Sequence, residues 1–167
     1  MSQSLSVKPS IALENSTPGT IQNRQLIEEI RHNDELFALI ISADFREPGI
    51  HFFTPNSLSQ QLAYMHHPQG KVIAPHIHNS VPRQVEYTQE VLLIRRGKVR
   101  VDFYTEQQEY LKSRVLEAGD VILLVKGGHG FEALEELEMI EVKQGPYVGD
   151  QDKTRFTPPS RSAEVSA

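Results

Sequence analysis

The chain of 167 residues contains no cysteine and no tryptophan, and aromatic residues make up only 7% of it. The absence of cysteine excludes disulfide bonds, thiolate metal ligands and a cysteine nucleophile. No apolar run approaches the length of about 18 residues that a membrane-spanning helix needs, so we expect no membrane partner. Because residues 1–20 hold no apolar stretch typical of a secretory signal, we expect a cytoplasmic protein.

Positive charge is also scarce. The 17 Lys and Arg residues oppose 22 Asp and Glu residues, which gives a formal net charge of -5 at pH 7. Neutralisation of phosphates by cationic side chains supplies much of the affinity of proteins for nucleic acids. The acidic balance therefore argues against a nucleic-acid partner, and a small-molecule ligand or substrate is the partner that we expect.

The length suits a single domain with a hydrophobic core. Residues 1–20 are rich in Ser, Pro and other polar residues without a sustained period, which predicts a flexible N-terminal arm. Residues 157–167 have a similar composition and predict a disordered C-terminal tail. One domain is therefore expected over residues 21–156.

One short helix followed by many short strands is predicted within this domain. Asn23 can cap a helix over residues 24–31. Further on, apolar or alternating segments are broken by turn residues about every 8–12 positions, which predicts an all-β sandwich or barrel. Gly97 indicates a hairpin between two of these strands, and periodicity alone leaves a buried helix open for residues 36–41. The predicted strands are 36–41, 50–54, 58–67, 71–78, 90–94, 98–105, 110–116, 121–125, 131–134 and 139–143.

Four candidate metal ligands lie in or beside these predicted strands. His76 and His78 are two positions apart, so in a strand both imidazoles leave the same face. Glu90 begins an apolar strand, where a buried carboxylate needs a partner such as a cation. His129 lies among glycines, whose backbone can bend to aim the ring. These ligands suit one divalent ion of Fe, Mn, Zn, Ni or Cu without choosing among them. The alternative is that the His-x-His pair is incidental.

The spacing of these residues resembles the two sequence motifs of the cupin superfamily. The matching residues, in order, are Gly70, His76, His78, Glu90 and Gly97 in the first motif and Gly119, Gly127 and His129 in the second. The resemblance covers residues 36–143 and implies a double-stranded β-helix, which is a jelly-roll barrel. It also implies that His76, His78, Glu90 and His129 hold a metal inside the barrel mouth, and that the protein is a homodimer.

The motifs depart from the family pattern in two places that concern the ligands. Eleven residues separate His78 from Glu90, which is a longer gap than is usual in cupins. Only one residue separates Gly127 from His129, one fewer than usual. Because a shift of one residue in a strand reverses the side-chain direction, this second departure bears on whether His129 points into the barrel.

Further residues are candidates for contact with a substrate. Arg83, Tyr87 and Phe131 are candidate substrate-binding residues, and Tyr87, Glu141 and Lys143 are candidate catalytic residues. Arg83 and Tyr87 lie in the insertion between the ligand strands, which either covers the barrel mouth or is a solvated loop. Glu141 and Lys143 share one face of a strand, and they can act only if that face is the inner one. Phe131 shares the parity of His129, and core packing is its alternative role.

The expected function is that of a metal-dependent enzyme acting on a small carbohydrate-like or carboxylate molecule. A metal acting as a Lewis acid fits an isomerase or epimerase, and Fe(II) fits an oxygenase. The end of the domain, residues 141–153, is similar to small cupins associated with surface polysaccharide biosynthesis. The alternatives are a non-catalytic binding or sensing module and a barrel that holds no metal, since fold does not fix function.

Overall fold

The computed structural model describes residues 24–159 of the chain. The predicted N-terminal arm, and the predicted C-terminal tail from residue 160, lie outside these described residues. Within residues 24–159, no helix is long and apolar enough to cross a membrane. The elements are β1 (Ile27–His32), β2 (Glu35–Ile41), β3 (Gly49–Phe52), β4 (Ala63–His66), β5 (Glu90–Arg96), β6 (Lys98–Tyr104), β7 (Tyr110–Glu117), β8 (Val121–Leu124), β9 (Gly128–Ala133), β10 (Glu138–Lys143) and the 3-10 helix η1 (Gly149–Gln151).

The first described element corrects the prediction of a helix over residues 24–31. Residues 27–32 form β1, which pairs antiparallel with β2 and places Ile30 opposite Ala38. Ile30 is fully buried in this pairing. Pairing with a neighbouring strand and burial of a β-branched side chain therefore outweigh the local helix signal. The prediction of a strand over residues 36–41 is confirmed, because β2 covers it.

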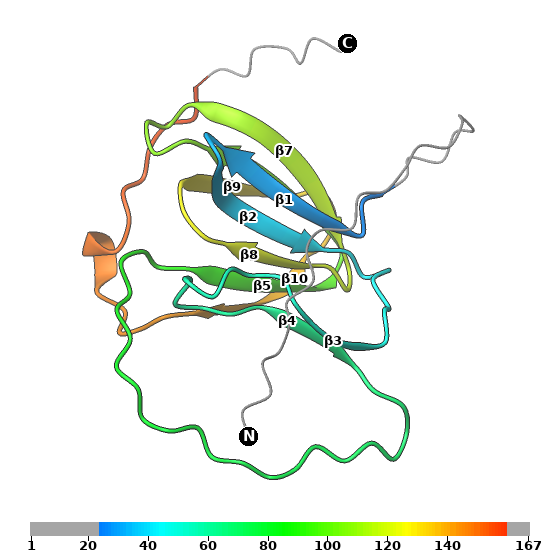
Figure 1. Ribbon diagram of the computed structural model, residues 1–167. Helices are drawn as coiled ribbons and strands as arrows, with labels where there is room; N and C mark the ends of the chain where they lie inside the picture. The colour runs from blue at the N-terminus through cyan, green and yellow to red at the C-terminus, as the bar shows by residue number, and fades with distance from the viewer. Residues whose placement is uncertain (1–23, 160–167) are drawn as a thin grey trace.

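Two antiparallel sheets face each other in an open sandwich (Figure 1). The larger sheet has the strand order β1-β2-β8-β5-β10, the smaller sheet has the order β7-β6-β9, and β3 and β4 form a separate hairpin. The pairs β5–β10 and β6–β9 are nested, so the chain moves repeatedly from one sheet to the other. The all-β prediction is confirmed, and the described strands do not close into a barrel.

The chain also changes sheet at Gly97, where the sequence predicts a hairpin. That prediction is wrong, because the described strands β5 and β6 belong to different sheets and do not pair with each other. Gly97 has a φ of +79°, and a Cβ atom at this position would collide with the backbone carbonyl of Glu136. Glycine is therefore required both for the turn and for the close approach of two chain segments.

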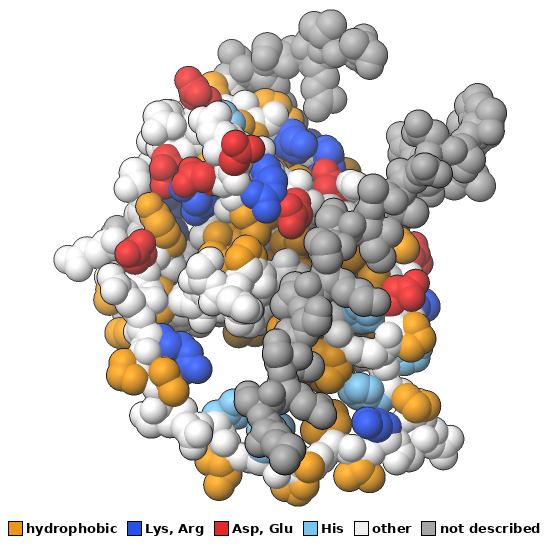
Figure 2. Space-filling model, in the orientation of Figure 1, with side chains coloured by type: hydrophobic (Ala, Val, Ile, Leu, Met, Phe, Trp, Pro, Cys, Tyr) orange, Lys and Arg blue, Asp and Glu red, His pale blue; other side chains and the backbone are white. Residues whose placement is uncertain are grey.

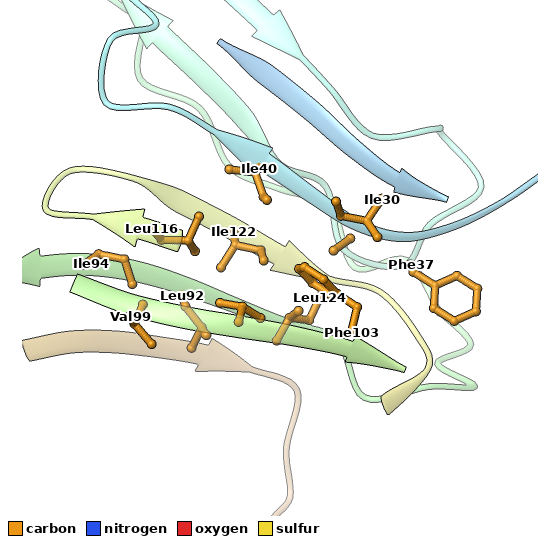
Figure 3. Close-up of a cluster of buried hydrophobic side chains, with 12 residues drawn as sticks. Ile30, Phe37, Ile40, Leu92, Ile94, Val99, Phe103, Leu116, Ile122 and Leu124 are labelled. Carbon is orange, nitrogen blue, oxygen red and sulfur yellow. The ribbon is translucent and has the colours of Figure 1, made fainter. Parts of the chain in front are cut away.

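Side chains from both sheets fill the space between them (Figure 3). Leu92 and Ile94 of β5 meet Val99 and Phe103 of β6 in this cluster. Val99, Val101 and Phe103, which alternate along β6, are all buried.

The outer face of the larger sheet is covered too. Phe53, Leu58 and Leu62, from the segment between β3 and β4, pack in a second cluster that includes Leu39 of β2 and Leu123 of β8. Both faces of β2 and β8 are therefore buried. This explains why these two strands are continuous apolar runs rather than alternating ones.

One side of the sandwich remains open. Within residues 24–159, β9 pairs only with β6 and β10 pairs only with β5. The segment of residues 67–89, called the long loop below, leaves this region as a wide green arc in Figure 1. The prediction of a strand over residues 71–78 is wrong for this structure, since these described residues form no strand. Figure 2 shows apolar side chains spaced along the arc.

Candidate functional site at the open side of the sandwich

The strand register determines which polar residues face the interior of the sandwich. Glu90 has the same parity as the buried Leu92 and Ile94, so it lies on the inner face of β5. In the pairing of β10 with β5, Lys143 lies opposite Glu90 and Glu141 lies opposite Leu92. Opposite residues of paired strands share a face. Glu141 and Lys143 therefore lie on the inner face, which is the arrangement that a role at the site requires.

His129 and Phe131 also face inward. They lie opposite Phe103 and Val101, both of which are buried. The turn before β9 is set by Gly127, which has a φ of +75° and lies close to the Phe37 ring. The shortened spacing in the second motif therefore does not turn His129 away from the interior.

These side chains form a connected polar group, called the mouth cluster below. The Nε2 atom of His129 lies 3.2 Å from Oε2 of Glu90. Lys143 Nζ lies 3.5 Å from Oε1 of Glu90 and 2.8 Å from Oε1 of Glu141. The rings of His129 and Phe131 have centroids 5.3 Å apart. The mouth cluster thus joins three strands, β5, β9 and β10, from both sheets.

Opposite charges in the mouth cluster stabilise one another. The hydrogen bond with His129 is the main cause that lowers the pKa of Glu90, and attraction to Lys143 acts in the same direction. Partial burial opposes this shift without reversing it. The neighbouring carboxylates, Glu141 first and then Glu90, raise the pKa of Lys143. The partner that the sequence requires for Glu90 is therefore supplied here by an imidazole and an ammonium group.

The other two predicted metal ligands lie elsewhere. His76 and His78 are exposed in the long loop, where their ring centroids are 5.1 Å apart. Nδ1 of His76 lies 3.0 Å from the backbone carbonyl oxygen of Ala74. The structure therefore brings Glu90 together with His129, and His76 together with His78, but not all four. Within residues 24–159, no group of three or more His, Asp or Glu side chains is arranged to hold a metal ion.

The substrate-binding candidates of the long loop are Arg83 and Tyr87, and their described contacts include no residue of the mouth cluster. Arg83 is exposed, and its Nη1 atom donates to the carbonyl oxygen of Val81, 3.3 Å away. Tyr87 is half exposed, and Lys126 Nζ lies 5.8 Å from the centre of its ring. The same ammonium group donates to Oε2 of Glu35 at 2.7 Å. Sequence analysis did not predict that Lys126 contacts both Tyr87 and Glu35. The signal in the sequence is a cation placed between a buried strand and a glycine turn.

The class that the fold and this geometry define is an antiparallel β-sandwich protein with an inward-facing carboxylate–imidazole pair at its open side. Such a group can transfer protons, hold a polar ligand or supply nitrogen and oxygen ligands to a cation. Comparison of the chain with protein-family models, with curated proteins and with solved structures found no match.

Proposed function

We propose that this chain is a metal-binding cupin in which His76, His78, Glu90 and His129 hold one divalent transition metal ion. The observation that carries the proposal is the contact between Glu90 and His129. These two residues come from different sequence motifs and different sheets, yet they meet on the inner face. A carboxylate and an imidazole placed in this way have the donor chemistry that such an ion prefers.

The strand pairing supports a double-stranded β-helix for the domain. Nested antiparallel pairs divided between two facing sheets are typical of a jelly roll. In the described residues, the free edge of β9 is the place where one further strand would complete the smaller sheet. Residues 71–78, which carry His76 and His78, are the segment that we assign to that place.

The described position of the long loop does not fit a four-ligand site, so the proposal requires the loop to close on β9. Three of its apolar side chains, Val72, Ile73 and Ile77, are 79%, 56% and 91% exposed. Exposed apolar groups and an unpaired strand edge both favour further association. The eleven residues between His78 and Glu90 can span roughly 36 Å when extended, so the chain length permits this closure.

The proposed activity is that of an isomerase, epimerase or oxygenase acting on a small carbohydrate-like or carboxylate molecule. A bound metal would supply Lewis-acid chemistry. Lys143 is the inward cation and would hold a carboxylate or hydroxyl group of the substrate. Glu141 is hydrogen-bonded to Lys143 and is placed to exchange a proton with the substrate. Phe131 would provide an apolar wall.

A homodimer is part of the same proposal. Leu93, Ile140 and Val142 lie side by side on the outer face of β5 and β10 and are 38%, 45% and 57% exposed. Apolar groups that gather in this way on an otherwise polar surface are typical of protein–protein contacts. Sedimentation of the purified protein tests the dimer, and a Val142→Glu variant should shift it to a monomer.

A second candidate function is a small-molecule binder that holds no metal. One observation favours it: Lys143 and His129 already satisfy the charge of Glu90. In that case the mouth cluster itself would bind the ligand, and the His-x-His pair would have no role.

Metal content separates the two candidates. The full chain is incubated with Mn²⁺, Fe²⁺, Zn²⁺ or Ni²⁺, dialysed and measured by elemental mass spectrometry. We expect near-stoichiometric metal in the parent and its loss in His76→Ala/His78→Ala and in Glu90→Gln/His129→Ala. His66→Ala, which changes an exposed histidine of β4 outside the proposed ligand set, is the matched control. A parent protein without metal would contradict the proposal, as would a His76→Ala/His78→Ala variant that keeps it.

A further inference from the structure

The C-terminal segment, residues 144–159, continues from the end of β10 and returns to the smaller sheet. Figure 1 shows this segment, coloured orange to red, running along one end of the sandwich. Its contact with the smaller sheet is made by Phe156, whose ring meets the Tyr104 ring edge to face at a centroid distance of 5.2 Å. Within residues 153–159, Phe156 is partly buried and its neighbours are exposed. Phe156 is therefore the apolar side chain that attaches this segment to the sandwich.

His129 lies between two glycines that cannot anchor it by themselves. Gly128 and Gly130 alternate with His129 along β9, so they face outward while the imidazole faces inward. A glycine has no side chain whose packing would fix the backbone. Within residues 24–159, β9 pairs with β6 alone, so no second strand holds its other edge. The position of the imidazole therefore depends on what packs against the outer face of β9.

Two aromatic rings cover the outer face at these glycines. A Cβ atom at Gly128 would lie 3.1 Å from Cζ of Phe156, and one at Gly130 would lie 3.9 Å from Cε2 of Tyr104. Tyr104 lies opposite Gly128 in the strand register and is only 3% exposed. An aromatic ring that packs over a glycine compensates for the missing side chain in a β-sheet. Phe156 and Tyr104 thus supply the packing that side chains at positions 128 and 130 would otherwise provide.

We propose that Phe156 is a positioning residue for His129. Its ring holds Gly128 against β6, which fixes the start of β9 so that Nε2 of His129 stays 3.2 Å from Oε2 of Glu90. The ring lies on the outer face of the smaller sheet, whereas closure of the long loop would use the free edge of β9, so the two contacts are compatible. The effect on metal binding rests on the proposed function, and the effect on the Glu90–His129 contact does not.

NMR of the histidine ring nitrogens in the metal-free full chain tests the positioning directly. At one fixed alkaline pH, the contact with Glu90 should keep the ring proton of His129 on Nε2 in the parent. Phe156→Ala should spread this proton between Nε2 and Nδ1, and Phe156→Leu, which keeps apolar volume without the flat ring, should do so to a smaller extent. Tyr147→Ala removes a 69% exposed ring from the same segment and should match the parent. A proton distribution unchanged in both Phe156 variants would overturn the proposal, even if their melting temperatures fall.

Calorimetric titration of the same proteins with Mn²⁺ is the second readout. The affinity of Phe156→Ala for Mn²⁺ should fall roughly tenfold, because loss of a group that orients a metal ligand typically costs this much. The affinity of Tyr147→Ala should equal that of the parent. Equal affinity in Phe156→Ala and a metal-binding parent would contradict the positioning role. A parent that binds no metal would contradict the proposed function instead, and the proton distribution of His129 would then decide the role of Phe156 by itself.

Discussion

The centre of the sandwich and the long loop contain similar apolar residues in opposite environments. Ile122 and Leu123 of β8 are fully buried, whereas Val72 and Ile77 of the long loop are among the most exposed side chains. The difference lies in the neighbours: β8 pairs with β2 and β5, while residues 71–78 have no paired strand in the described structure. Apolar composition therefore predicts burial only where a second strand and a covering layer are present.

The largest expected effect contrasts the two regions directly. Leu123→Ala should lower the free energy of unfolding by about 2–5 kcal/mol, because the side chain is buried in a packed layer. Ile77→Ala should change it by less than about 0.5 kcal/mol, because its side chain is exposed. Urea denaturation of the metal-free proteins measures both values. A large loss in Ile77→Ala would show that the loop packs against the sandwich even without metal.

Two glycines with similar backbone angles offer a finer comparison. Gly97 joins β5 to β6 with a φ of +79°, and Gly70 lies in the long loop with a φ of +82°. Gly97→Ala meets the backbone of Glu136 in addition to the strained φ, so it should cost about 2–4 kcal/mol. Gly70→Ala meets no atom within 4 Å among the described residues and should cost about 1 kcal/mol.

Denaturation of these two variants side by side isolates the cost of the collision from the cost of the left-handed backbone. Equal losses in the two variants would contradict the crossing geometry at Gly97.

The smallest expected effect concerns acid stability. The pKa of Glu90 in the folded chain lies below its ordinary value of 4.5, mainly because of the hydrogen bond with His129. Its contribution is therefore complete above pH 4.5 and is lost as the pH falls through the lower folded value. Since Glu90 is partly exposed, the loss should be about 1 kcal/mol or less. Glu90→Gln should lack this acid-dependent part.

The measurement is the free energy of unfolding as a function of pH between about 3 and 7. Glu47→Gln, an exposed position before β3, should follow the parent. A Glu90→Gln curve that falls as steeply as the parent curve would show that the mouth cluster does not hold the charge of Glu90.

Much of the sandwich centre could be predicted because its sequence signals do not depend on distant partners. The continuous apolar run of β8 and the alternating pattern of β6 each indicate burial by themselves. Parity along the strands also predicted which residues share a face. For this reason Glu141 and Lys143 were predicted to share a face, and Phe131 to share that of His129.

Other features depend on contacts that no local pattern contains. Leu26, Ile27 and Ile30 fit a helical stripe, yet pairing with β2 makes the stretch a strand. Gly97 marks a turn but does not indicate that the next strand joins the other sheet. Residues 71–78 carry an acceptable strand pattern, but in the described structure they pair with no strand.

Amide hydrogen exchange of residues 71–78 tests the proposed closure of the long loop on β9. Exchange of residues 71–78 is compared with and without Mn²⁺ in the parent and in His129→Ala. We expect slower exchange with Mn²⁺ in the parent and no change in His129→Ala, because in the proposed closure the loop becomes a strand only when the ion joins its histidines to His129. Unchanged exchange in a parent that has bound Mn²⁺ would contradict closure of the long loop on β9.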